Sequence, residues 1–527
     1  MSLPDLFHNL LDDRILGIED DRGHRENVTL PGLLARLSRA EPVELTRLQA
    51  HQQHPWHAFL VQLAALALVR ANEDEIGHDE PAWRALLLAT AAQDGAGPEA
   101  FTLVVGDLAK PAFMQPPVPE GSLAALKYAH VRPSSELDVL ITAKNHDVKI
   151  DRLASPTPEH WVLSLVTLQT MQGFLGRGNY GIARMNGGFS SRSCVAYAPD
   201  QGAAARFVRD VRALREARLD LAERGFGKKA ALGLVWCAPW DGEMSLPFAA
   251  IDPFFVEICR RVRLSADAEG HIVAHRGSSK TARIDAGETY GNTGDAWTPV
   301  KREDGKALTM SESGFAYDRV QDLMFGDWKH GAAGQADQGG GDGYWLGQVL
   351  VRGQGKTGGY HERWVPVPPR ARGFLANRDA RAKLGKRAQG WVGLAKTARL
   401  NVLKPALLTL LQGAPEKLKF DDDRADPILR KLDAEIDLHF FRLLFEHADE
   451  PSEAADSAFQ KRLFEVAKVE LDRAAASVPL SCARRQRAIA KAYAVLHGAA
   501  RRQLELAFPP AAAVPAPEAA ESQGVVP

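Results

Sequence analysis

The stretch Val365-Pro366-Val367-Pro368-Pro369 divides this sequence into two parts with different hydrophobic patterns. Because closely spaced prolines cannot continue the interior of a sheet, a linker or domain edge is expected here. From Arg372 onward, apolar residues recur at three- and four-residue spacing among Ala, Leu, Arg, Lys and Glu, which is typical of amphipathic helices. Before it, helix-like stretches alternate with Gly- and Pro-rich connections and short strand-like segments.

This division predicts an α+β protein, with a large mixed N-terminal domain over 1–368 followed by an all-α four-helix bundle over 369–508. In the first domain, helices are predicted over Trp56–Ala71, Ala82–Gln93, Pro158–Gln172 and Ala203–Arg224, and a short strand over Phe101–Val105. In the second, helices are predicted over Ala380–Leu411 (bent at Pro405), Pro427–Glu446, Ser452–Ala476 and Ser481–Leu506. The remaining 509–527, rich in Ala, Pro and Glu, predict a disordered tail.

Composition narrows the class of protein. The 527 residues include 65 Lys and Arg against 66 Asp and Glu, so bulk charge does not indicate a globally basic nucleic-acid binder, and any anion site must be local. The 4 cysteines show no CxxC spacing, which argues against a disulfide framework and a cysteine zinc site. The apolar stretch Trp56–Val69 is too short to cross a membrane, and no secretory signal is expected, so a cytoplasmic protein is predicted.

Two glycine-rich motifs could bind phosphate, but their contexts differ from those of nucleotide sites. Gly176–Gly181 matches GxGxxG, yet it follows a predicted helix rather than a strand. Two interpretations stay open: a plain loop, or a loop packed against a ligand backbone with anion contacts from Arg177, Arg184 and Arg192. Gly353–Thr357 resembles the end of a P-loop, but Leu350 stands where its first glycine is required. A loop presenting Gln354, Lys356 and Thr357 could still touch a phosphate or a base edge.

Other polar clusters have simpler interpretations. Leu137–Lys149 is an apolar run that ends in polar residues, where Lys144 and Asn145 could contact a phosphate and a base edge, although a turn is commoner. The sequence around His51, His54 and His57 favours an interpretation as histidines at a helix entry and on the surface over one as metal ligands. The sequence contains no GxSxG motif, and no acid pair stands out. We therefore predict no catalytic residue, no metal and no cofactor.

Taken in order along the chain, four features resemble the large subunit (CasA) of the type I-E Cascade, a CRISPR RNA-guided surveillance complex. Pro111-Ala112-Phe113-Met114-Gln115 is similar to a Pro-Phe-Met-Gln segment of that family. Gly173–Gly188 is similar to its glycine loop, and Gly353–Arg363 to its late Gly-rich hairpin. The predicted helical C-terminal third corresponds to its four-helix bundle.

The resemblance implies a non-catalytic subunit that recognises the protospacer-adjacent motif (PAM) in double-stranded DNA, largely from the minor groove. It implies a role in strand separation and R-loop formation, and in recruiting the helicase-nuclease that cleaves DNA. The partners it implies are CRISPR RNA, double-stranded target DNA, the other Cascade subunits and the helicase-nuclease, with no membrane.

The resemblance also assigns roles to individual residues. Gly176, Gly178, Asn179 and Tyr180 fall on the glycine loop, and Lys280 falls near the minor-groove lysine, with Arg276 and Arg283 as its alternatives. Gln354, Lys356 and Thr357 fall on the wedge that separates the duplex, and Lys144 and Asn145 on a loop that contacts the guide-RNA end and the PAM region. Arg381, Lys383, Lys386 and Arg387 are candidates for holding separated strands, although a solvated helix face is the commoner interpretation of each.

Two functions of other classes remain as alternatives. A nucleotide-binding enzyme that uses both glycine loops predicts saturable nucleotide binding by the isolated chain. A purely structural scaffold subunit predicts that mutations in the loops leave target-DNA binding unchanged.

Overall fold

The computed structural model describes residues 6–126, 128–131, 134–138, 156–188, 191–227, 231–335, 342–353 and 356–506. Side chains are described at all of these except 6, 128–131, 353 and 356–357. The chain forms two compact units, Met1–Gly385 and Lys386–Pro527. The predicted tail over 509–527 lies outside the described residues. The predicted α+β class with a helical C-terminal region is confirmed.

The first unit contains several small sheets rather than one large one. Its strands are β1 (Leu6–Asn9), β2 (Leu16–Asp20), β3 (Arg25–Val28), β4 (Val43–Leu45), β5 (Thr102–Val105), β6 (Tyr128–Val131), β7 (Cys194–Pro199), β8 (Leu232–Leu234), β9 (Ile251–Val256), β10 (Arg261–Ala266), β11 (Ile272–Gly277), β12 (Val300–Lys301), β13 (Trp328–Lys329), β14 (Gly343–Gly353) and β15 (Lys356–Val367). The three-stranded sheets have the orders β3-β2-β4, β10-β11-β6 and β15-β14-β7, and all their pairs are antiparallel.

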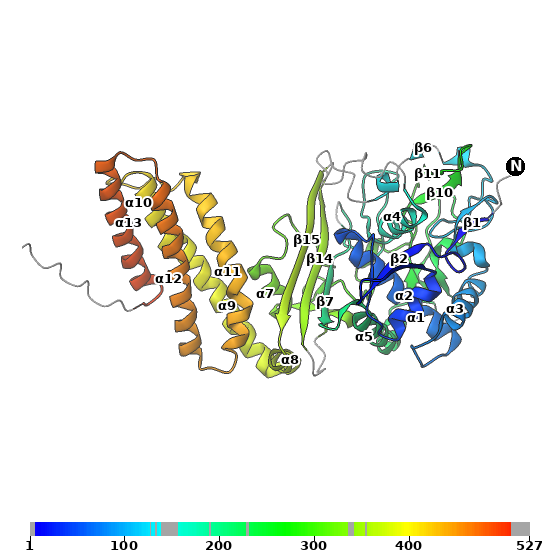
Figure 1. Ribbon diagram of the computed structural model, residues 1–527, viewed down its shortest axis with the longest axis horizontal. Coiled ribbons are helices and arrows are strands. Elements are labelled where there is room, and N and C mark those ends of the chain that lie inside the picture. Colours follow the sequence, from blue (N-terminus) through cyan, green and yellow to red (C-terminus); the bar gives the residue numbers. More distant parts are fainter. Residues whose placement is uncertain are drawn as a thin grey trace, which may run out of the picture. The chain divides into compact units, whose positions relative to one another are not determined.

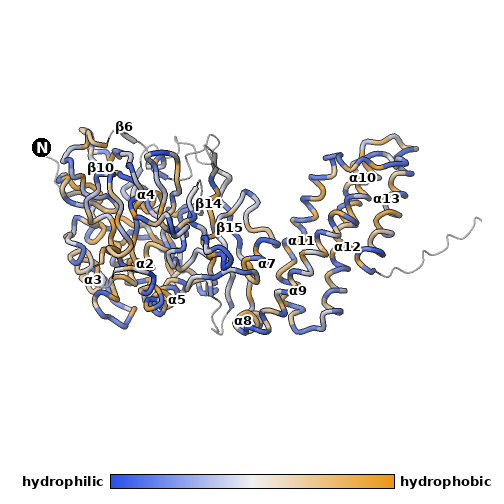
Figure 2. The backbone as a smooth tube through the Cα atoms, turned by 180° about the vertical axis from the view of Figure 1, so that it is seen from behind, coloured by the Kyte–Doolittle hydropathy of each residue, from blue (hydrophilic) through white to orange (hydrophobic). Residues whose placement is uncertain are grey.

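The helices of the first unit include one long buried helix. They are α1 (Leu30–Ser38), α2 (Gln53–Ala71), α3 (Glu80–Gln93), α4 (Pro158–Met171), α5 (Gly202–Glu216), α6 (Arg218–Ala222), α7 (Tyr317–Phe325) and α8 (Pro369–Ala376). In α2 almost every residue from His54 to Leu68 is buried, and hydrophobic residues follow its path in Figure 2. The apolar stretch Trp56–Val69 is thus a core helix, as predicted. In the described part of the chain, no helix is both long and apolar enough to span a bilayer.

The longest strands form a hairpin (Figure 1). β14 pairs with β15 along its whole length, and its other edge pairs with β7. Trp345 in β14 is fully buried, so the base of this hairpin is part of the protein core. The proline run lies where β15 ends, at Val367, and α8 begins, at Pro369. Because proline lacks an N–H and fixes φ, it suits both the end of a strand and the first turn of a helix.

The second unit is helical. Its elements are α9 (Arg378–Thr397, beginning in the first unit), a π-helical segment (Ala398–Leu403), α10 (Lys404–Leu411), α11 (Asp426–Glu446), α12 (Ser452–Ser477) and α13 (Cys482–Gln503). Trp391 stacks on Phe459 with a ring-centroid distance of 4.2 Å, and Phe440 meets both rings edge-on. The helix predicted over Ala380–Leu411 is interrupted by the π-helical segment, and Pro405 lies in the first turn of α10, where a missing N–H is tolerated.

Candidate nucleic-acid interface

The glycine loop is a tight turn that follows α4. The Leu175 amide donates to the Asn179 carbonyl at 2.9 Å, and the Asn179 amide donates to the Gly176 carbonyl at 3.0 Å. Gly176 and Gly178 adopt φ values of +106° and +89°, which residues other than glycine rarely adopt. The turn therefore needs glycine at both positions, with Gly176 half-buried and Gly178 buried.

The neck of this loop is closed by backbone packing and by a buried arginine. A Cβ atom on Gly181 would lie 2.8 Å from the Gly173 carbonyl carbon, so the two chain segments touch without room for a side chain. The Arg260 guanidinium donates to the Gly173 carbonyl at 2.7 Å and also to the Tyr180 carbonyl. Because Arg260 is buried and its side chain crosses the neck, the loop is held in place rather than left as a free connection.

The segment that carries Lys280 packs directly against the glycine loop. The Ser279 amide donates to the Gly178 carbonyl at 3.1 Å, and a Cβ atom on Gly178 would lie 3.0 Å from the Ser278 Cβ. Asn179 and Tyr180 are half-buried on the same loop. The structure thus brings together the predicted residues Gly176, Gly178, Asn179, Tyr180 and Lys280.

Lys280 is exposed and points into an acidic turn that the sequence analysis missed. Its Nζ lies 2.7 Å from Glu243 Oε1, and its amide donates to the Gly242 carbonyl at 2.6 Å. The hydrogen bond that Lys280 donates to Glu243 raises the pKa of Lys280, and the charge of Asp241 adds to the effect. Turn residues far apart in sequence carry no pairing signal, so this contact could not be anticipated.

The two alternatives to Lys280 are placed differently. Arg283 is buried and donates to the carbonyls of Pro239 and Ala238, at 3.2 and 2.9 Å. Arg276 is half-buried, and burial lowers its pKa. Of these three cations, Lys280 is the exposed one.

The hairpin segment predicted to be a wedge lies at the β14–β15 tip. Gly353 pairs with Lys356 and Arg352 with Thr357, so the backbones of Lys356 and Thr357 belong to the first residues of β15. Their side chains, and Gln354 entirely, lie outside the described residues. Ser191, which pairs with Gln172 at the base of the glycine loop, donates its hydroxyl to the Leu350 carbonyl. The hairpin is therefore joined to the glycine-loop region close to its tip.

Lys144 and Asn145 lie outside the described residues, within 139–155, and Asp138 is the last described residue before them. Asp138 lies 2.6 Å from His51 Nε2 and accepts a hydrogen bond from Gln52 at 2.7 Å. Burial and the charge of Arg260 lower the pKa of Arg352 to about 10, against the opposing charge of Asp138. Arg352 near the hairpin tip, Arg260 at the neck of the glycine loop and Asp138 are thus electrostatic neighbours.

Two of the arginines considered as anion contacts are structural instead. Arg184 is buried and pairs with Glu257 at 2.8 Å, and Arg192 makes a bidentate pair with Asp295 at 2.6 Å. A buried guanidinium already paired with a carboxylate is not available to a ligand, so that interpretation was wrong for both.

Arg177 is exposed on the glycine loop. On α9, Arg381 and Arg387 donate to backbone carbonyls of Met324 and Glu450, whereas Lys383 and Lys386 are exposed.

The three spaced histidines do not form a metal site with one another. His51 contacts Asp138, and His57 Nε2 lies 2.8 Å from Asp210 Oδ2. His51 and His54 are buried, so their expected surface position was wrong, although all three do lie at the entry to α2. Their pattern follows from two separate carboxylate contacts and core packing.

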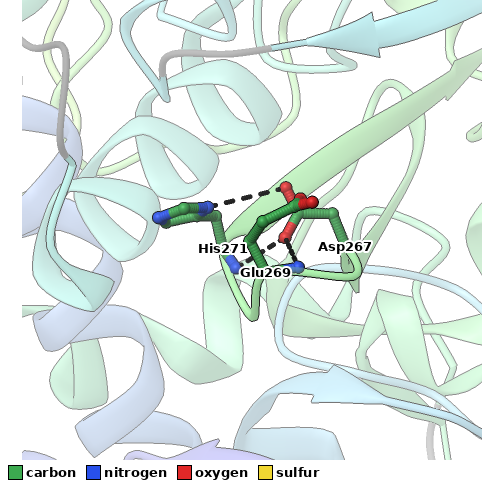
Figure 3. Close-up of side chains that lie close together, drawn as sticks. All are labelled: Asp267, Glu269 and His271. Carbon is green, nitrogen blue, oxygen red and sulfur yellow. Dashed lines mark hydrogen bonds and ion pairs between the residues drawn. The ribbon is translucent and has the colours of Figure 1, made fainter.

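A second group with metal-ligand chemistry lies at the β10–β11 turn, where Asp267, Glu269 and His271 come together (Figure 3). The Asp267 carboxylate accepts hydrogen bonds from the amides of Glu269 and His271, at 3.0 and 2.8 Å. These bonds are those of an aspartate that caps a turn, and Glu269 and His271 are exposed. The turn geometry accounts for the grouping, and we assign no metal to it.

Neither glycine motif has the surroundings of a nucleotide site. Gly176–Gly181 follows α4 and leads through further loop residues toward β7. Gly353 and Lys356 connect two antiparallel strands. Phosphate-binding loops of both known kinds run from a strand into a helix N-terminus, so the context expected from sequence is confirmed.

No protein-family model and no curated protein sequence matches this chain. Solved structures do match it along nearly its whole length. CasA (Cse1) of Thermus thermophilus is 16% identical, with a TM-score of 0.58 over 95% of this chain and 100% of that chain. Cse1 of Thermobifida fusca is 14% identical, with a TM-score of 0.63 over 96% of this chain and 100% of that chain. A chain of a CRISPR RNA-guided surveillance complex is 13% identical, with a TM-score of 0.57 over 93% of this chain and 99% of that chain.

At identities this low, the structural similarity shows that the chains share a fold and shows nothing beyond the fold. The chain therefore has the CasA (Cse1) fold, and the resemblance seen in the sequence is confirmed at that level.

Proposed function

We propose that this chain is the large subunit of a type I-E Cascade complex, in which it reads the protospacer-adjacent motif of double-stranded DNA. The similarity to CasA (Cse1) structures spans nearly the whole chain, which supports the assignment. The similarity to a chain of a CRISPR RNA-guided surveillance complex supports CRISPR RNA and other Cascade subunits as partners. In this role the protein is non-catalytic and cytoplasmic, and a helicase-nuclease recruited by the complex cleaves DNA.

One observation carries the proposal: the glycine loop and the loop of the exposed Lys280 are joined by a backbone hydrogen bond of 3.1 Å at Gly178. The minor groove of B-DNA is only about 6 Å wide and offers mainly acceptors, at A N3 and T O2. A thin glycine backbone fits such a groove, and a lysine at its edge supplies the donor. Asn179 and Tyr180 on the same loop add polar contacts.

The hairpin tip is proposed to open the duplex next to the motif. Lys356 and Thr357 begin β15, and Gln354 follows Gly353 in the sequence, so the candidate wedge lies at one end of two long paired strands whose base is in the core, which gives it a stiff support. Unstacking a base step costs a few kcal/mol, which protein contacts and guide pairing must repay. Lys144 and Asn145 would contact the end of the guide RNA and the motif region.

The test is target-DNA binding by the reconstituted guide-RNA complex, with and without this subunit, on duplexes with randomised motifs beside a matched protospacer. Gly178→Asp is expected to abolish motif preference, because a charged side chain at this buried position would collide with Ser278 and displace the loop that carries Lys280. Gly225→Asp is the matched control, since Gly225 has the same φ of +89° with no atom within 4 Å of its Cβ position. Motif preference that is the same without the subunit contradicts the proposal.

The two alternatives predict different results in the same experiments. A scaffold subunit predicts that Gly178→Asp and Gly225→Asp complexes bind all duplexes equally well. A nucleotide-binding enzyme predicts saturable ATP or NAD binding by the isolated chain that Gly178→Asp or Lys356→Ala removes.

A further inference from the structure

A cavity of about 370 Å³ lies in the first unit. The glycine loop and the loop that carries Lys280, called the reading loops below, do not line it. It is formed by β7, β13, α8, the start of α9 and the segments beside them. Its lining comprises Tyr197, Arg302, Trp328, Lys329, His330, Gly334, Gln335, Leu375, Ala376 and Arg381. Three of these residues are cationic, and no described residue in the lining is acidic. A cavity this size accommodates a group larger than a simple ion.

The cations of this cavity are only weakly neutralised. Lys329 is exposed and has no ion-pair partner among the described residues. Arg302 is 60% exposed and lies 3.7 Å from an equally exposed Asp327, a separation at which an ion pair contributes little. Arg381 donates to the Met324 carbonyl, which carries no net charge. The three positive charges therefore remain available to an anion.

Tyr197 also favours an anion in the same place. Its hydroxyl makes no hydrogen bond within the described part of the chain. Burial raises the pKa of Tyr197 to about 12, against the charges of Arg381, Arg372 and Arg209, so the hydroxyl keeps its proton and can donate it. A neighbouring cavity shares Lys329 but is also lined by Asp220 and Glu223, so it does not present the same charge.

We propose that this cavity binds phosphate groups of a polynucleotide backbone. Arginine and lysine side chains around a polar hollow are the groups that bind phosphodiesters. Neither the tyrosine nor the tryptophan ring among the described lining residues offers a surface on which a base could stack: Tyr197 and Trp328 are both buried, and Lys301 and Arg319 lie 5.0 and 5.2 Å from the Trp328 ring centroid. Its lining thus suits a charged backbone better than a free nucleotide, whose base would have no partner.

This site is separate from the reading loops. Tyr197 pairs with Trp345 at the base of the hairpin, and Gly353 at the tip is on the order of 25 Å further along β14 at the usual rise of a strand. In Figure 1, α8 likewise follows the end of the hairpin opposite to the tip. The inference goes beyond the proposed function and does not depend on motif recognition.

The test measures binding of a fluorescent single-stranded oligodeoxythymidylate to the full-length isolated chain over a range of salt concentrations. Arg302→Gln/Lys329→Gln is expected to weaken binding at least about fivefold and to reduce the salt slope by about 0.7 per lost contact. Arg302→Lys/Lys329→Arg keeps both charges and is expected to retain binding. Arg25→Gln/Arg84→Gln is the control, because it removes two exposed, ion-paired charges elsewhere in the same unit.

Inorganic phosphate and ATP serve as competitors, and we expect neither to displace the oligonucleotide at equal concentration. Displacement by either at that concentration would overturn the assignment to a polynucleotide. Equal losses in the test and control variants, or unchanged binding in both, would overturn the site itself. The reconstituted complex that carries Arg302→Gln/Lys329→Gln is expected to keep its motif preference, so failure here is distinguishable from failure of motif recognition.

Discussion

The backbone amide of Ser279 lies 3.1 Å from the carbonyl oxygen of Gly178 and donates a hydrogen bond to it. This bond joins the glycine loop to the loop that carries Lys280. The contact depends on the absence of a side chain at Gly178, whose Cβ would lie 3.0 Å from the Ser278 Cβ. Glycine is therefore required at this position for two reasons: its own turn has a positive φ, and a second loop packs against it without room for a side chain.

We expect Gly178→Ala to destabilise the chain by two separable effects. The positive φ costs about 1–3 kcal/mol for a residue with a side chain, and contact with Ser278 adds to it. Gly225→Ala has the same φ of +89° but no neighbouring atom within 4 Å, so it isolates the backbone cost. Hydrogen exchange at the Ser279 amide should accelerate in Gly178→Ala alone. Equal exchange at Ser279 in both variants would show that the two loops are not coupled.

Glu243→Gln should strengthen DNA binding by the reconstituted complex about twofold or more, because it removes a carboxylate that competes with DNA for Lys280 and repels phosphate. The pKa of Lys280 should fall as well, since its hydrogen bond to Glu243 raises it. Dissociation constants for a motif-bearing duplex measure the first effect. Glu269→Gln, an exposed acid in the β10–β11 turn, carries the same change of charge and should have no effect. Weaker binding by Glu243→Gln would mean that Glu243 positions Lys280 productively.

The sequence was a good guide to elements with strong periodic patterns. The helix predicted over Trp56–Ala71 is α2, and that over Pro427–Glu446 is α11, each differing by three residues or fewer at its ends. The helix predicted over Ala203–Arg224 is instead two helices, α5 and α6, because the chain turns at Ala217. Local hydrophobic spacing determines such elements, while their interruptions depend on packing.

The site was predictable only in part. The glycine-rich turn is a local signal, and Gly176 and Gly178 do adopt positive φ. The Glu243–Lys280 pair and the Arg260 contacts across the loop neck depend on tertiary packing and leave no local pattern. Buried arginines misled the analysis for the same reason: Arg184 and Arg192 look like surface cations until their partners Glu257 and Asp295 are known.

Acidic pH should destabilise the first unit through buried neutral histidines. Burial and the charge of Arg206 lower the pKa of His57 to about 4, against the opposing contact with Asp210. The unfolded state, with an ordinary histidine pKa near 6.5, then binds more protons than the folded state between pH 6.5 and 4. Stability is therefore full above about pH 6.5 and is lost as the pH falls toward 4, by up to about 3 kcal/mol from His57.

Thermal unfolding measured from pH 7 to pH 4 tests this directly. His57→Gln keeps a donor toward Asp210 but cannot protonate, so its melting temperature should fall less over that interval than that of the wild type. His24→Gln, which changes an exposed histidine, should follow the wild-type curve. A His57→Gln curve parallel to the wild type would mean that other groups, such as His330, dominate the acid transition.

A target whose base pairs beside the motif are already unpaired should distinguish motif reading by the glycine loop from duplex opening by the hairpin tip. If the hairpin tip opens the duplex, Gln354→Ala/Lys356→Ala should weaken binding of the complex to fully paired target at least about tenfold, since unstacking costs a few kcal/mol per step. A target with a short mismatched bubble beside the motif needs no opening, so this variant should bind it like the wild type. Gly178→Asp should lose motif preference on both targets, because reading precedes opening. A wedge variant that remains equally defective on the bubble target would contradict strand separation by the hairpin and point instead to a direct contact with the motif.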